Sequence, residues 1–175
     1  MMERRQSTTI TMLVLAALCV FGLFFGLRAL TSDLPGGGIL NEAPVCEPRT
    51  VTPGSQIAPA EVAVSVYNAS NRNGLAGKTM KTLIERGFVA ADSGNVRTKK
   101  VVAVEIWSTE PDNPAVQLVK AQFGPNTKVV RPRKDIGAGV VVVVGNDFAG
   151  LAKKFPETME VKARATICSP RDPTA

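Results

Sequence analysis

Apolar residues recur at every second position along two segments of the chain, and this period of two predicts β-strands. Over residues 62–68, valines alternate with smaller or polar residues. Residues 101–107 alternate in the same way up to Trp107. We therefore expect each segment to bury one face and to leave the other face more polar.

Three shorter stretches complete the predicted strands. Residues 88–91 predict a short strand, followed by a turn at 93–95, and residues 127–130 predict a brief edge strand. Val140 to Val144 are five consecutive valines, a run typical of a strand that is buried on both faces. We expect this last strand near the middle of the sheet.

Two segments between the strands have helical spacing. The first helix is predicted to begin at Leu75 after a turn-rich segment and to stop at Gly87. The second starts with Asn113 as N-cap and Pro114 in the first turn, and it ends at Gly124.

The elements therefore follow one another as β, α, β, β, α, β, with room for one extra edge strand. This order predicts an α+β domain over residues 61–148, a two-layer α/β sandwich of the split βαβ type with two helices on one face of the sheet. Residues 149–175 form a C-terminal extension. Strict alternation within it predicts a further half-buried strand at 158–168.

The N-terminal part of the chain has a different character. Thr8 to Leu27 are twenty residues without a charge, long enough as a helix to cross the roughly 30 Å hydrocarbon layer of a bilayer. Residues 1–7 contain Arg4 and Arg5, which favours a cytoplasmic tail and places the rest of the chain outside. We therefore expect a single-pass membrane protein with an extracytoplasmic domain.

The alternative is a cleaved secretory signal, whose apolar region is usually shorter, about 7 to 15 residues, and ends in small residues. No such cleavage site follows Leu27. Residues 28–60 hold five prolines and a run of three glycines, a composition that predicts an unfolded linker between membrane and domain.

Composition excludes several kinds of chemistry. The chain has no histidine, which excludes histidine-based triads and metal sites that depend on histidine, and we expect no metal, no cofactor and no catalytic residue. The net charge is +6, a mild excess that includes the residues flanking the apolar run and does not indicate a nucleic-acid partner.

The chain has three cysteines, of which Cys19 lies within the apolar run. Cys46 and Cys168 flank the domain, each in the context Cys-x-Pro-Arg. In an oxidising compartment these two are the candidates for a mutual disulfide, and two unpaired thiols are the alternative.

The segment between the first strand and the first helix is the strongest candidate for a binding site. At the C-terminal end of this segment, residues 74–79 are similar to the end of a phosphate-binding loop. However, Arg72 stands where that motif requires its first glycine. A helix start still offers backbone N–H groups and a positive dipole end to an anion. The alternative is that Asn68 and Ser70 only cap the turn and that Lys78 is a solvated charge. The candidate ligand-binding or partner-binding residues are Asn68, Ser70, Asn71, Arg72, Gly74 and Lys78.

Two further features admit two interpretations each. Glu105, Glu110 and Asp112 cluster near the end of a predicted strand, and paired carboxylates can hydrolyse glycosidic bonds. The simpler interpretation is a turn and a helix cap. Trp107 either packs on the sheet or stacks on a sugar.

Residues 64–88, 104–124 and 137–148 together resemble the LytR C-terminal domain, which occurs after LytR-CpsA-Psr catalytic domains or alone behind one transmembrane helix in actinobacterial envelope proteins. The resemblance implies an extracytoplasmic module associated with envelope biogenesis, with no catalytic residues of its own. The flanks of Cys46 and Cys168 are similar to those of stand-alone relatives, which favours the disulfide. The catalytic domain itself is absent from this chain.

We therefore expect a membrane-anchored, non-catalytic binding module in cell-envelope biogenesis or maintenance, whose partner is a cell-wall polymer or an envelope protein. One alternative is a structural accessory subunit that stabilises a membrane complex through Thr8 to Leu27. A wall-glycan hydrolase is the other.

Overall fold

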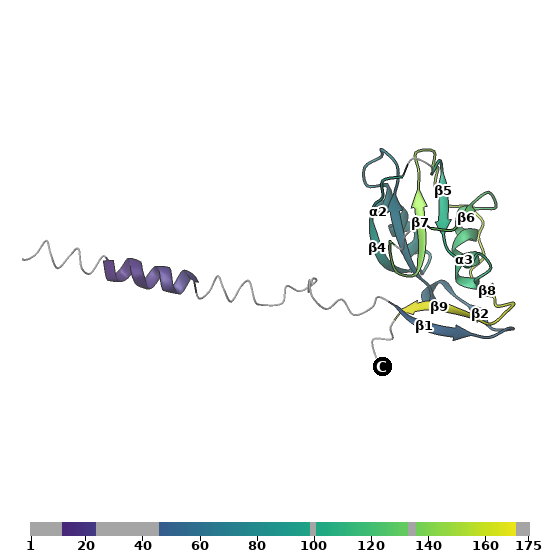
Figure 1. Ribbon diagram of the computed structural model, residues 1–175, viewed down its shortest axis with the longest axis horizontal. Coiled ribbons are helices and arrows are strands. Elements are labelled where there is room, and N and C mark those ends of the chain that lie inside the picture. Colours follow the sequence, from purple (N-terminus) through teal and green to yellow (C-terminus); the bar gives the residue numbers. More distant parts are fainter. Residues whose placement is uncertain (1–11, 24–45, 99–100, 133–135, 171–175) are drawn as a thin grey trace, which may run out of the picture. The chain divides into compact units, whose positions relative to one another are not determined.

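The computed structural model describes residues 12–23, 46–98, 101–132 and 136–170, and the chain divides into two compact units, Met1–Ala43 and Pro44–Ala175 (Figure 1). In the first unit, residues 12–23 form a helix with exposed side chains, including the thiol of Cys19. None of the helices in the described part of the chain is long and apolar enough to span a membrane. The predicted span 8–27 extends past the described helix at both ends and stays a prediction.

The second unit is built on a five-stranded mixed sheet (Figure 1). Its strands are β3 (Ala63–Asn68), β4 (Val89–Asn95), β5 (Val104–Trp107), β6 (Lys128–Val130) and β7 (Val140–Val144). They lie in the order β4-β3-β7-β5-β6, and only β5 and β7 pair antiparallel. The edge strand and the central position of the valine run are confirmed.

The split arrangement predicted for the sheet is wrong. Helix α2 (Leu75–Glu85) connects β3 to its parallel neighbour β4, and α3 (Pro114–Phe123) connects β5 to its parallel neighbour β6. No strand is inserted inside either βαβ unit. Instead β7, the strand with the most completely buried side chains, separates the two units, because that position covers it on both faces.

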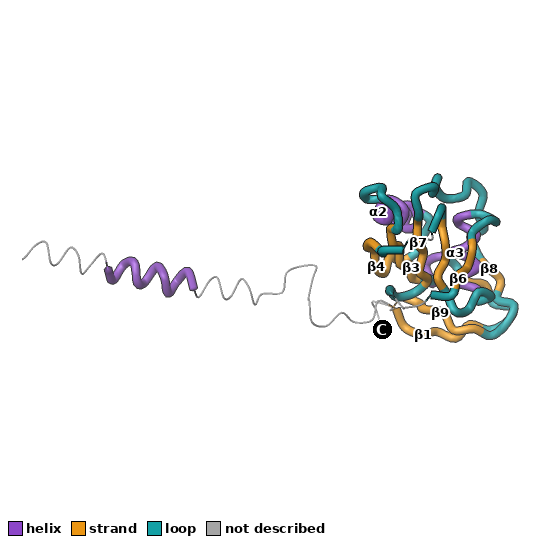
Figure 2. The backbone as a smooth tube through the Cα atoms, turned by 45° about the horizontal axis from the view of Figure 1, so that its top comes forward, coloured by secondary structure: helices purple, strands orange, loops and turns teal. Residues whose placement is uncertain are grey.

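Both helices cover the same face of the sheet, as predicted. Side chains of α2, α3 and the inner strands form one core there, and Figure 2 shows the helices and strands in separate colours. The fully buried members of this core include Val64, Val66, Leu83, Ile106, Leu118, Val119 and Val142.

The predicted helix boundaries are also confirmed. The Asn113 side chain accepts a hydrogen bond from the Ala115 N–H at 3.0 Å, so it is the N-cap of α3. Helix α2 ends before Gly87, whose φ of 89° is a conformation that glycine adopts without strain.

Strand β4 is longer than predicted, because residues 93–95 continue it and do not form a turn. The register passes from Val64 opposite Ala90 to Val66 opposite Ser93, so β4 contains a bulge. The Asp92 N–H donates to Ser65 Oγ at 3.2 Å inside this bulge. Residues 93–95, whose sequence indicated a turn, follow the bulge and pair in register with residues 66–68 of β3.

The N-terminal boundary of the domain lies earlier than predicted. We expected an unfolded linker over residues 28–60, but β1 (Cys46–Val51), β2 (Gln56–Ile57) and the 3₁₀ helix η1 (Pro59–Glu61) belong to the folded unit. Val51 and Ile57 are buried in the main core, which explains why this proline-rich stretch is ordered. The part of the predicted linker before Cys46 lies outside the described residues.

The C-terminal extension pairs with this N-terminal segment (Figures 1 and 2). β1 pairs antiparallel with β9 (Ala165–Pro170), and β2 pairs antiparallel with β8 (Met159–Glu160). The continuous strand predicted at 158–168 is therefore wrong. Residues 161–164 interrupt it because the chain passes from one partner strand to the other, with Val161 fully buried between them.

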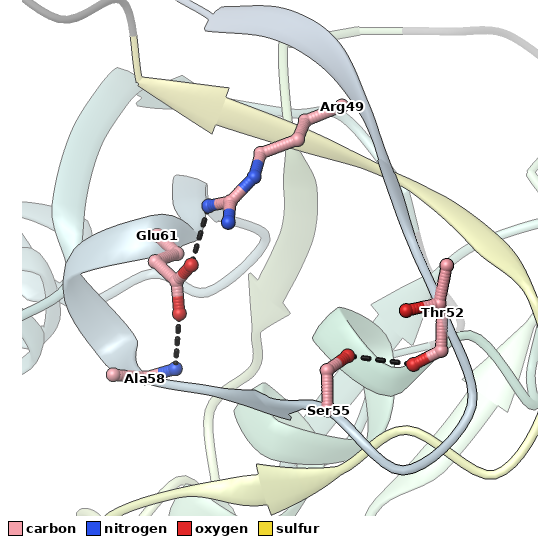
Figure 3. A network of polar contacts seen from close by, with 5 residues as sticks. All are labelled: Arg49, Thr52, Ser55, Ala58 and Glu61. Carbon is pink, nitrogen blue, oxygen red and sulfur yellow. Dashed lines mark hydrogen bonds and ion pairs between the residues drawn. The ribbon is translucent and has the colours of Figure 1, made fainter.

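Side-chain contacts hold β1 against η1 (Figure 3). Arg49 of β1 forms an ion pair with Glu61 of η1, and the second carboxylate oxygen of Glu61 accepts the Ala58 N–H at 2.8 Å. In the preceding turn, Ser55 Oγ donates to the Thr52 carbonyl oxygen at 2.6 Å. The Arg49 side chain is 53% exposed, so the ion pair orients β1 and adds little to stability.

The predicted disulfide between Cys46 and Cys168 is present. Their Cα atoms lie 5.2 Å apart and the bridge spans a sequence separation of 122. It joins β1 to β9 at the end where the chain enters and leaves the folded unit. The structure therefore favours this pairing over the alternative of two unpaired thiols.

Candidate functional site

The candidate binding residues lie at one edge of the sheet. Because β3, β4 and β7 are parallel, their carboxyl ends meet at the same edge. The loop that follows β3, residues 69–74, therefore lies beside the loop that follows β7, residues 145–148. The Ala69 N–H donates to the Val144 carbonyl oxygen at 2.8 Å and continues the pairing of the two strands into these loops.

Asn68 organises the first of these loops. Its side chain is largely buried, with the residue 6% exposed. Its Oδ1 accepts from the Ser70 N–H at 2.9 Å and from Ser70 Oγ at 2.6 Å, while its Nδ2 donates to the Arg72 carbonyl oxygen at 2.8 Å. Asn68 and Ser70 therefore shape the turn, as the capping interpretation predicts.

Arg72 and Asn71 form hydrogen bonds to the loop that follows β7. Arg72 Nη1 donates to the carbonyl oxygens of Phe148 at 2.6 Å and Asn146 at 3.4 Å. The Asn71 N–H donates to Asn146 Oδ1 at 2.9 Å. Sequence reasoning missed Asn146, because it follows the valine run without any pattern that points to the other loop. These hydrogen bonds join the two loops.

Arg72→Ala is expected to lower the free energy of unfolding by about 1–2 kcal/mol, because it leaves the Phe148 carbonyl without its charged donor. Urea unfolding of the full chain in detergent measures this. Arg97 is exposed on another loop, and Arg97→Ala is the matched control, with an expected change below about 0.5 kcal/mol. Equal effects of the two substitutions would contradict a structural role for Arg72.

Gly74 and Lys78 lie where the loop becomes α2. Gly74 adopts φ 71° as the N-cap residue, and its carbonyl oxygen accepts the Lys78 N–H at 3.0 Å. Both residues are exposed. Lys78 therefore adds a positive charge to the positive end of the α2 dipole.

Two of the three candidate carboxylates, Glu105 and Glu110, are engaged in separate local contacts. Glu110 accepts from Asn113 Nδ2 at 3.0 Å, next to the cap of α3, which agrees with the turn-and-cap interpretation. Glu105 accepts from Trp107 Nε1 at 3.1 Å. Within the described ranges, no group of three or more acidic or cysteine side chains could hold a metal ion.

Comparison with known proteins places the fold among envelope-related domains. A family model described as "LytR cell envelope-related transcriptional attenuator" matches residues 61–148, from the last residue of η1 to the loop after β7. No curated protein matches the chain.

Two solved structures are similar to this chain. One is the soluble domain of a conserved hypothetical secreted protein from Mycobacterium marinum, 26% identical over 63% of this chain and 78% of that one, with a TM-score of 0.45. The other is the C-terminal domain of RV0431, 26% identical over 66% of this chain and 97% of that one, with a TM-score of 0.34.

Proposed function

We propose a function from the premise that the chain belongs to the LytR C-terminal domain family: it is a non-catalytic binding module that acts outside the cytoplasm, in biogenesis or maintenance of the cell envelope. The uncharged stretch from Thr8 to Leu27, with Arg4 and Arg5 before it, supports a single membrane anchor with a cytoplasmic N-terminus. The Cys46–Cys168 disulfide supports an oxidising compartment for the folded unit.

The observation that supports a binding role is the pair of hydrogen-bonded loops at the carboxyl ends of β3 and β7. Asn68, Ser70 and Arg72 are used internally to fix the loop. Residues 71–74 of the loop are exposed, and so is Lys78 in the first turn of α2. A fixed backbone with a cation suits recognition of an anionic group on a cell-wall polymer or an envelope protein.

Co-sedimentation of the full chain in detergent with a purified, insoluble cell-wall fraction tests this proposal. Lys78→Glu reverses the charge at the loop and is expected to lower the bound fraction at least threefold. Lys81→Glu is the matched control, because Lys81 is exposed one turn further along the same helix, and it is expected to bind as the parent chain does. Equal losses in both variants would indicate non-specific charge attraction and contradict the proposal.

Replacing residues 8–27 with an unrelated membrane span distinguishes the two hypotheses, a binding module and an accessory subunit. A binding module keeps its bound fraction after the exchange, because the folded unit makes the contact. Loss of binding would point to a subunit that acts through its span.

A further inference from the structure

The sheet has a second face, opposite α2 and α3, which we call the helix-free face. Cross-strand pairing places Tyr67, Val143, Glu105 and Lys128 in one row and Ser65, Val141, Trp107 and Val130 in the next. Residues 136–139 cover the β3 half of this face. The half formed by β5 and β6 keeps Trp107 partly exposed and Val130 36% exposed.

A cavity of about 140 Å³ lies between these two halves. Trp107 and Val141 of the sheet line one side, Ser108 and Thr109 line another, and the backbone around Gly137 and Gly139 forms the opposite wall. Pro132 and Ile136 complete the lining, so the cavity combines an aromatic residue, two hydroxyl-bearing residues and apolar side chains.

Hydrogen bonds from the sheet hold the opposite wall in place. Fully buried Ser65 donates through Oγ to the Ala138 carbonyl oxygen at 2.6 Å, and Tyr67 donates through its hydroxyl to the Ile136 carbonyl oxygen. The Ala138 N–H donates to Asp92 Oδ2 at 3.3 Å. Burial, and secondarily the Asp92 charge, raise the pKa of Tyr67, so its hydroxyl stays protonated and continues to donate.

Glycines allow the wall to approach the sheet this closely. A Cβ on Gly137 would come within 2.8 Å of Ser65 Oγ and of the Tyr67 hydroxyl. A Cβ on Gly139 would come within 2.1 Å of the Ala63 carbonyl oxygen. The cavity is therefore a preformed feature of the fold and is not a gap left by a loose loop.

Trp107 is held in one orientation. Its Nε1 donates to Glu105 Oε2 at 3.1 Å, so the one polar atom of the indole is already satisfied. What it can offer a ligand is the face of its ring. The Glu105 carboxylate and Lys128 lie directly opposite one another in the neighbouring row and add polar groups beside the ring.

We propose that Trp107 and this cavity form a saccharide-binding site, in which a pyranose ring stacks on the indole and one ring substituent enters the cavity. Sugar rings present an apolar C–H face and hydroxyl groups at their edge, which matches an aromatic face bordered by a carboxylate and hydroxyls. The volume suits one substituent and is well below the roughly 300 Å³ at which pockets for larger ligands begin. A proline-rich peptide also docks on aromatic side chains, but it needs a longer groove.

This site goes beyond the proposed function, because it lies at the other end of the sheet from the Lys78 loop. Trp107 pairs with Val141 near the start of β7, whereas Asn68 pairs with Val144 at its end. Saccharide binding at Trp107 can therefore hold or fail independently of recognition at Lys78.

Trp107 is the only tryptophan of the chain, so its fluorescence reports directly on the site. The full chain in detergent is titrated with cellotetraose and with chitotetraose, which carries acetamido groups in place of 2-hydroxyls. We expect a saturable change in emission with at least one of them and a dissociation constant on the order of 1 mM, typical of one stacked ring. No saturable change with either tetrasaccharide overturns the proposal, and so does a response to decaproline alone.

Calorimetry on variants checks the location of the site. Trp107→Ala is expected to weaken tetrasaccharide binding at least tenfold, while Phe155→Leu, at a half-exposed aromatic that Arg86 covers, is the control and binds normally. Glu105→Ala is the second variant, in case Trp107→Ala fails to fold as judged by circular dichroism, and it is expected to weaken binding about threefold. Unchanged affinity in the folded variants overturns the assignment to this cavity.

Discussion

Replacing both Cys46 and Cys168 with alanine is expected to lower the free energy of unfolding by about 5 kcal/mol in the chain-entropy account of cross-links. The sequence separation of 122 makes the closed loop long, so the bridge removes a large amount of conformational freedom from the unfolded chain. Because domains of this size are stable by only about 5–15 kcal/mol, the loss is a large share of the total. Guanidinium unfolding of the full chain in detergent measures it.

The structural consequence of this loss begins in the ribbon formed by β1 and β9. The two strands pair over their whole length, from Cys46 opposite Pro170 to Val51 opposite Ala165. Val51 and Ile167 reach the main core, so opening of the ribbon also exposes apolar surface. We therefore expect the double variant to lose protection from proteases first in β1 and β9.

Reduction provides the control for the double substitution. A reductant should lower the unfolding midpoint of the parent chain to near that of the double variant and leave the variant itself unchanged. A parent chain whose midpoint does not respond to reductant, with the thiols shown to be free, would contradict a stabilising disulfide.

Local sequence patterns predicted those helices and single strands whose ends and burial depend on residues close in sequence. Asn113, Pro114 and Gly87 mark helix ends through their own backbone preferences, so their effect needs no distant partner. The valine run predicts a central strand because five apolar side chains in a row need cover on both faces. These elements were predicted at nearly their observed bounds.

The elements that were missed depend on partners far away in the chain. β1 and β2 lie in a proline-rich stretch with few apolar residues, and they become strands because residues 165–170 and 159–160, respectively, pair with them. Pro48 is compatible with a two-stranded ribbon, since a proline is tolerated where one edge has no partner strand. The pairing of strands within the sheet is likewise non-local, which is why the split topology was predicted wrongly.

The loop that carries the candidate binding residues was predicted in its location, whereas its contacts were predicted only in part. The turn-rich composition of residues 68–74 indicates a loop after a strand, and the structure shows one there. The contacts of Arg72 to the loop after β7 could not be predicted, because they depend on β3 and β7 being parallel neighbours. The cavity beside Trp107 has the same origin, since residues 136–139 reach it only through the fold.

Gly139→Ala is expected to lower the free energy of unfolding by about 3–5 kcal/mol, because two costs add at this position. Its φ of 69° lies in the left-handed region, which costs a residue with a Cβ about 1–2 kcal/mol. The new Cβ would also come within 2.1 Å of the Ala63 carbonyl oxygen, so β3 or the loop must move.

Two other glycines separate these costs in the same chain. Gly54 has φ 83° with nothing within 4 Å of an added Cβ, so Gly54→Ala should cost about 1 kcal/mol through conformation alone. Gly145 has an ordinary φ, but its Cβ would lie 2.3 Å from the Val101 carbonyl oxygen, so Gly145→Ala should cost about 2–3 kcal/mol through contact alone.

Chemical unfolding of the three variants should rank Gly139→Ala as the most destabilising substitution and Gly54→Ala as the least. If Gly139→Ala were no worse than Gly54→Ala, the loop would have room to move away from β3, and the wall opposite Trp107 would not be the rigid element that the hydrogen bonds of Ser65 and Tyr67 indicate.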